Sequence, residues 1–169
     1  NDVDRPLIIK VASISAARIQ VYFIDNEDYF YRKFIYTDEN GKFFDDNAER
    51  AIFFTRGVLE TVKKLRWAPD IIHCSGWISQ VLPLYLKKVY VDDPIFSNSK
   101  IVTSLYDDIP AEKFSGDFRE KILFGNINPE DVSLLEDPTG INLAKLAVEH
   151  SDGIILGVEN VRQEVLDYV

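Results

Sequence analysis

The sequence contains few of the residues that metal, redox and membrane proteins depend on. Among 169 residues there is a single cysteine, Cys74, so no disulfide can form within the chain. The two histidines, His73 and His150, match no zinc-ligand spacing with it. No apolar run approaches the roughly 18 residues of a membrane-spanning helix, and the first residues do not resemble a secretion signal. We therefore expect a cytoplasmic protein with no metal site and no membrane partner.

Basic residues are also scarce relative to acidic ones. The chain carries 19 Lys and Arg against 28 Asp and Glu, which gives a net charge of −9. Because binding to nucleic acid depends on neutralising phosphates, we expect no nucleic-acid partner. Methionine is absent, which leads us to expect a fragment or a numbering that starts inside a longer protein. With 46% hydrophobic and 28% charged residues, the chain has the composition of one globular domain with a core.

The order of predicted elements is typical of a doubly wound α/β sheet. Residues 7–14 and 18–24 alternate between apolar and polar residues, which predicts an antiparallel hairpin. Residues 25–44 are aromatic and charged, and we predict mostly loop there. After residue 45, helical and short apolar patterns alternate. Helices are predicted from Asp46 to before Pro69, over 76–89 with a kink at Pro83, over 117–124, from Asp137 to His150 and over 159–169; strands are predicted over 71–74, 101–105 and 153–158.

Two helix starts carry sequence signals of their own. Asp46 stands three residues before Glu49, which resembles a capping box. Asp137 precedes Pro138, and we expect Asp137 to cap the helix that follows. The fold class is therefore a Rossmann-like α/β sheet with a hairpin at its start. We expect residues 1–169 to be a single partial domain that lacks its first strand.

Ligands of such sheets bind outside the carboxyl ends of the strands, which here means residues 73–77, 105–108 and 158–160. A small-residue turn at 73–77 would let main-chain amides face a ligand, although many strand-to-helix turns have this form. Adjacent residues of a strand point to opposite faces, so we interpret Cys74 as a buried thiol and not as a nucleophile paired with His73. Ser75 lacks the glycines of a nucleophile elbow.

Two further groups of residues allow more than one interpretation. Asp107 and Asp108 follow a strand, where paired carboxylates serve acid/base chemistry or hold a cation, but acidic loops are often merely solvated. The aromatic residues between Tyr29 and Phe44 could stack on sugar rings. We favour the alternative that these rings fasten a long loop to the core.

Taken together, several segments resemble the bacterial glycogen and starch synthases, which are two-domain glucosyltransferases. D-N-A-E-R followed by I-F-F-T-R at 46–56 is similar to their D-N-A-E-R-F-A-F-F-S-R helix. W-A-P-D-I-I-H at 67–73 is similar to W-x-P-D-I-V-H, and Q-V-L-P-L-Y-L-K at 80–87 to the A-L-V-P-L-Y-L-K that follows. Residues 143–155 resemble the helix and strand ending in A-D. Order and spacing agree over nearly the whole chain.

The resemblance includes departures at positions that bear on activity. The family pattern H-A-H-D-W-H is replaced by H-C-S-G-W-I, so Gly76 stands where the family has an aspartate and Ser75 where it has a histidine. In the family pattern T-x-H-N-L, the His and Asn approach the donor glucose, and here Leu105 and Tyr106 stand in their places. The chain is most similar to a divergent branch that reads G-W and Y-N or Y-D at these positions.

The resemblance implies a function and a set of site residues. It implies the N-terminal half of a GT-B glucosyltransferase that extends an α-1,4-glucan from ADP-glucose or UDP-glucose, without a cofactor or metal. Its partners would be the glucan, the sugar nucleotide and a C-terminal domain, and an oligomer is compatible with it. The alternative is a catalytically degenerate relative that binds glucan or has a regulatory role. The substrate-binding candidates are His73, Ser75, Gly76, Trp77, Tyr106 and Asp107; catalytic residues are not identified.

Overall fold

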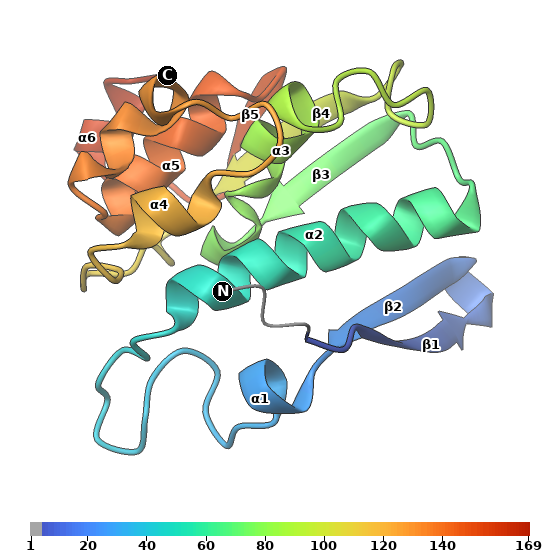
Figure 1. Ribbon diagram of the computed structural model, residues 1–169, viewed down its shortest axis with the longest axis horizontal. Coiled ribbons are helices and arrows are strands. Elements are labelled where there is room, and N and C mark those ends of the chain that lie inside the picture. The colour runs from blue at the N-terminus through green and yellow to red at the C-terminus, as the bar shows by residue number, and fades with distance from the viewer. Residues whose placement is uncertain (1–4) are drawn as a thin grey trace.

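Two separate sheets organise the chain in a computed structural model that describes residues 5–169 (Figure 1). The first is an antiparallel hairpin in which Ile14 pairs with Ile19 next to the turn. The second is parallel, in the order β3-β4-β5. This arrangement confirms the predicted α/β fold class and the hairpin. The strands are β1 (Ile8–Ile14), β2 (Ile19–Asp25), β3 (Ile71–Ser75), β4 (Lys100–Leu105) and β5 (Gly153–Leu156).

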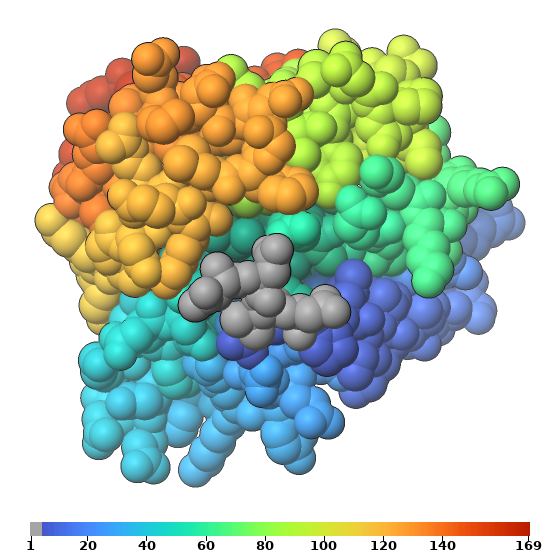
Figure 2. Space-filling view, viewed as in Figure 1, coloured from blue at the N-terminus to red at the C-terminus, as the bar shows by residue number. Residues whose placement is uncertain are grey.

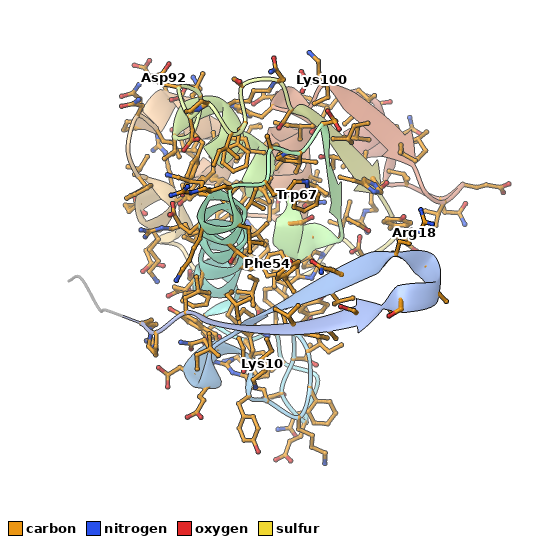
Figure 3. All side chains as sticks on the ribbon, turned by 90° about the vertical axis from the view of Figure 1, so that its right-hand side faces the viewer. Lys10, Arg18, Phe54, Trp67, Asp92 and Lys100 are labelled. Atoms are coloured by element: carbon orange, nitrogen blue, oxygen red, sulfur yellow. The ribbon has the colours of Figure 1, made fainter. Side chains whose placement is uncertain are left out.

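The longest helix, α2 (Asn47–Leu65), lies between the hairpin and the rest of the chain (Figure 1). Gly57 makes this packing possible, because a Cβ there would lie 2.8 Å from Cγ2 of Ile24 in the hairpin. The space-filling view shows the hairpin in dark blue on one side of α2 and the yellow-to-red half of the chain on the other (Figure 2). In a view nearly along the axis of α2, the hairpin runs across the helix and ends in a tip at Arg18 (Figure 3).

The remaining helices are short, and several differ from the predictions. Residues 25–44 include one turn of helix, and residues 129–136 form a 3-10 segment that the sequence analysis did not predict. The final helix is much shorter than the predicted span of 159–169. The elements are α1 (Glu27–Phe30), α3 (Leu82–Lys88), α4 (Phe118–Ile122), η3 (Pro129–Glu136), α5 (Gly140–Glu149) and α6 (Gln163–Leu166).

Three predictions about helix ends were wrong for identifiable reasons. Asp46 makes no side-chain cap, because its carboxylate accepts a hydrogen bond from Nη1 of Arg32 at 2.8 Å. Asp137 does not cap α5 either; Thr139 does, since its hydroxyl accepts from the amide of Asn142 at 3.1 Å. Pro83 lies in the first turn of α3, where its missing N–H costs no hydrogen bond, so the helix begins there instead of kinking.

One face of the parallel sheet is covered and the other is open. Ile72, Cys74 and Ile101 belong to the main core, which also includes residues of α2, α3 and α5. On the opposite face Ile71 is 63% exposed and Ile155 is 47% exposed. Polar side chains of β3 on this open face are therefore accessible at the end of the strand. Within residues 5–169, no helix has the length and apolar character needed to cross a membrane.

Candidate functional site

The parallel strands bring the three predicted ligand-binding segments to one edge of the sheet. Ser75 at the end of β3 is in register with Ser104 of β4, and Leu105 of β4 is in register with Leu156 of β5. The chain leaves all three strands at this edge, through residues 76–77, 106–108 and 157–160. The segments that the sequence predicted to bind a ligand therefore lie together at this edge, as expected for an open α/β sheet.

Alternation along β3 divides its polar residues between the two faces. Cys74 is 2% exposed on the covered face, and burial raises the pKa of its thiol to about 12. His73 and Ser75 are exposed, and Nε2 of His73 lies 2.7 Å from the hydroxyl oxygen of Ser104. The prediction of a buried thiol is confirmed. The imidazole of His73 and the hydroxyl of Ser75 are left on the open face as candidates for ligand binding, while Ser104 is buried.

Gly76 and Trp77 form a tight turn after β3. Gly76 has φ +80° and ψ 151°, a conformation that only glycine adopts without strain. The carbonyl of Gly76 accepts hydrogen bonds from the amide and the hydroxyl of Ser79, at 3.1 and 2.8 Å. Of the predicted substrate-binding residues, Trp77 is the one whose side chain is buried, with 1% exposed. What Trp77 presents at the strand end is therefore its main-chain amide.

The indole of Trp77 belongs to an aromatic cluster that fastens two loops to the sheet edge. Its ring centroid lies 4.8 Å from that of Tyr36, 5.8 Å from Phe43 and 5.4 Å from Phe114. Tyr29 is buried as well, whereas Tyr31 is exposed. The burial of these rings supports the interpretation that they fasten the loop to the core. This interpretation does not apply to the exposed ring of Tyr31.

The D-N-A-E-R segment at 46–50 also holds the loop of residues 25–44 in place. The side-chain amide of Asn47 donates to the carbonyl of Tyr36 at 2.9 Å. Nε of Arg50 donates to the carbonyl of Tyr29 at 2.9 Å, and its Nη1 to the side-chain oxygen of Asn47 at 2.5 Å. In this chain Asn47 and Arg50 therefore position the loop next to the site through their contacts with its backbone.

Beyond the cluster, the surface has a depression of about 590 Å³ with both aromatic and charged walls. Phe43 and Phe114 connect it to the ring of Trp77. Phe43 and Phe114 are themselves buried, so the partly exposed ring of Phe44 and the charged side chains are what the depression offers to a ligand. The lining residues are Lys42, Phe43, Phe44, Asp45, Glu112, Lys113, Phe114 and Ser115.

Residues 106–108, which follow β4, have three different environments. The ring of Tyr106 lies over Gly157, so that a Cβ at position 157 would be 2.2 Å from Cε1 of the ring. Asp107 and Asp108 are both exposed. Oδ2 of Asp108 accepts a hydrogen bond from the amide of Trp77 at 3.2 Å, which connects the ends of β3 and β4. The sequence analysis proposed Asp107 as a substrate-binding residue. In the structure it is Asp108 that forms the hydrogen bond between the two strand ends.

Two other features limit the chemistry of the edge. Leu105 is fully buried among residues of α5 and the C-terminal segment, so its side chain faces the core and not the edge. Among residues 5–169, no group of three or more His, Cys, Asp or Glu side chains is arranged to hold a metal ion. The groups available at the edge are hydroxyls, an imidazole, carboxylates and main-chain amides, which can bind a polar ligand through hydrogen bonds.

Comparison with known proteins points to one family. The family described as starch synthase catalytic domain matches residues 2–169. The glycogen synthase of Chlorobium limicola is 39% identical over 153 residues, covering 86% of this chain and 29% of that protein. The glycogen synthase of Clostridium perfringens is 35% identical over 144 residues, with 85% and 29% covered. The chain thus spans less than a third of the length of these relatives.

A solved structure is similar in fold. The catalytic domain of starch synthase IV from Arabidopsis thaliana, bound to ADP and acarbose, has a TM-score of 0.65 with this chain. The similarity covers 88% of this chain and 29% of that one, at 15% sequence identity. At this identity the comparison establishes the shared fold.

Proposed function

Because the chain belongs to the starch synthase catalytic domain family, we propose that the complete protein is a retaining glucosyltransferase that uses ADP-glucose or UDP-glucose to extend the non-reducing end of an α-1,4-glucan. The observation that carries the proposal is the similarity to proteins named glycogen synthase at up to 39% identity, over 86% of this chain. The collection of polar groups at the carboxyl edge of the sheet supports it.

In this proposal the described chain contributes sugar binding. The candidates remain His73, Ser75, Gly76, Tyr106 and Asp107, while the main-chain amide of Trp77 donates to Asp108 and so helps to shape the site. Their groups can form hydrogen bonds with glucosyl hydroxyls and thereby orient the transferred sugar. No cofactor is required in this scheme, since the sugar nucleotide is itself the substrate.

The departing diphosphate needs a different environment. Its developing negative charge must be stabilised by cationic side chains or helix amides. With a net charge of −9, this chain is poorly suited to provide that stabilisation. We propose that a C-terminal domain supplies it, as the family's two-domain architecture implies, and that residues 1–169 alone do not catalyse transfer.

The test is glucosyl transfer to glycogen by the complete protein, with ADP-glucose and UDP-glucose supplied in separate reactions. Residues 1–169 serve as the control, with circular dichroism to establish that this fragment is folded. Transfer by the complete protein with one donor would support the proposal and identify the nucleotide. A folded complete protein that transfers from neither donor would contradict it.

One observation favours a second candidate, a degenerate relative that binds glucan without transferring glucose. Positions 76, 105 and 106 lack the family's aspartate, histidine and asparagine, and Leu105 is buried in the core. This candidate predicts that the complete protein binds maltoheptaose in calorimetry but gives no transfer. Transfer at a rate comparable to a glycogen synthase would exclude it.

A further inference from the structure

Position 76, at the end of β3, cannot carry a side chain without backbone strain. Gly76 has φ +80° and ψ 151°, in the region that is essentially restricted to glycine. Hydrogen bonds from Ser79 to the Gly76 carbonyl hold the turn in this conformation. A functional side chain next to this turn must therefore come from another segment of the chain.

The carboxylate of Asp108 reaches this turn from the loop after β4. A Cβ built on Gly76 would lie 3.4 Å from Oδ2 of Asp108, which is ordinary van der Waals contact. The same oxygen accepts the hydrogen bond from the amide of Trp77 at 3.2 Å. The carboxylate thus lies next to the direction in which a side chain at position 76 would project, and a main-chain hydrogen bond helps to hold it there.

The chemistry of the carboxylate indicates what it can bind. Asp108 is exposed, and among the described residues no donor bonds to its Oδ1. An ionised carboxylate accepts strong hydrogen bonds and repels phosphate. Of the groups of a sugar nucleotide and a glucan, it can therefore bind sugar hydroxyls but not the diphosphate.

We propose that Asp108 binds hydroxyl groups of a glucosyl residue at the carboxyl end of β3, from a place beside the one that a side chain at position 76 would take. This inference rests on the proposed glucosyltransferase function and assigns a binding residue within it. The alternative is that Asp108 only caps the turn at Trp77, and the choice of variants separates the two.

Asp108→Asn keeps an oxygen that can accept from the Trp77 amide and removes the charge, whereas Asp108→Ala removes both. Asp92→Asn is the matched control, because Asp92 is exposed in the connection before β4, at the same end of the molecule as Lys100, where that strand begins (Figure 3). For the complete protein we expect Asp108→Asn to lower kcat/KM for transfer about 10- to 100-fold, since hydrogen bonds to charged groups have this range of effects, with an unchanged melting temperature. Asp92→Asn should match wild type.

If Asp108→Asn retains wild-type kcat/KM and only Asp108→Ala lowers the melting temperature, Asp108 is a turn cap and the inference is wrong while the transferase function stands. If wild type transfers no glucose, the proposed function fails, and calorimetric titration with maltoheptaose, ADP-glucose and UDP-glucose decides about Asp108. Weaker binding of one of these sugars by Asp108→Asn than by wild type would support the inference. Equal binding, or no binding by either protein, would overturn it.

Discussion

The ring of Tyr106 occupies the space beside Gly157, with Cε1 of the ring 2.2 Å from where a Cβ on residue 157 would lie. The two residues follow the neighbouring strands β4 and β5, so the ring bridges the loops at the edge of the sheet. The placement of Tyr106, a candidate for sugar binding, thus depends on the absence of a side chain at position 157.

Gly157→Ala is therefore expected to displace the tyrosine ring and to destabilise the complete protein by about 1 kcal/mol or more, through overpacking. In Tyr106→Ala the obstacle is gone, so adding Gly157→Ala should cost much less. A double-mutant cycle of free energies of unfolding measures this difference. Gly116→Ala is the control, because Gly116 has no atom within 4 Å of the new Cβ. Additive effects at positions 106 and 157 would contradict the contact.

Cys74 should be unreactive in the folded protein. Burial raises the pKa of its thiol to about 12, so only about one thiol in ten thousand is ionised at pH 8, and reagents cannot reach it. We expect iodoacetamide to leave Cys74 unmodified in native protein and to label it fully in 6 M guanidinium, with peptide mass spectrometry locating the label. Labelling of native protein at the rate of glutathione would show that β3 opens or that this edge is accessible.

The sequence predicted most of the helices and strands, because an element with one buried face has apolar residues at a regular spacing. The apolar spacing of Ala51, Val58 and Val62 marked α2, and the short apolar runs marked β3, β4 and β5. Helix ends were less predictable. Asp46 and Asp137 are good caps by residue type, but ion pairs with Arg32 and Lys113, distant in sequence, engage them instead. Such partners are known only once the chain has folded.

The candidate site was predictable to the level of its segments. Parallel strands end at one edge, so residues 73–77 and 105–108 were expected to meet there. The role of Asp108 could not be deduced, because it depends on the backbone angles of Gly76 and on the path of the loop after β4. The G-W sequence after a buried strand was the available signal, since a glycine at a strand end often marks unusual backbone geometry.

Arg50→Lys is expected to destabilise the protein by about 2 to 4 kcal/mol. Arg50 is almost fully buried, and burial lowers the pKa of its guanidinium. A lysine ammonium cannot reproduce the two directed hydrogen bonds to Tyr29 and Asn47, and an unpaired acceptor in the core is costly. Urea denaturation measures the loss. Arg66→Lys is the control, since the Arg66 side chain is exposed, and its change should stay within about 0.5 kcal/mol. Equal effects of the two variants would refute a clamping role for Arg50.

Asp152 should make stability depend on acid pH. Its amide donates to the carbonyl of Ile101, its Oδ2 accepts from the amide of Ile101, and its Oδ1 accepts from Lys87, at 2.8, 2.8 and 2.9 Å. Burial pushes the pKa of Asp152 upward, but the two hydrogen bonds that its carboxylate accepts and the charge of Lys87 outweigh burial and leave the pKa lowered. The folded state thus binds a proton less readily than the unfolded state. The resulting stability is present above the unfolded pKa of about 3.9 and is lost as the pH falls through the folded pKa.

Comparison of wild type with Asp152→Asn isolates this contribution from other carboxyls with lowered pKa values, such as Asp117 and Asp131, because these are common to both proteins. We expect the variant to be less stable by about 1 kcal/mol at pH 7, a modest value because Lys87 is partly exposed to solvent. The difference should shrink as denaturation is repeated from pH 5 down to pH 2.5. A difference that stays constant over this range would mean that the asparagine disturbs packing at the start of β5, and that the charge of Asp152 does not help to hold β4 and β5 together.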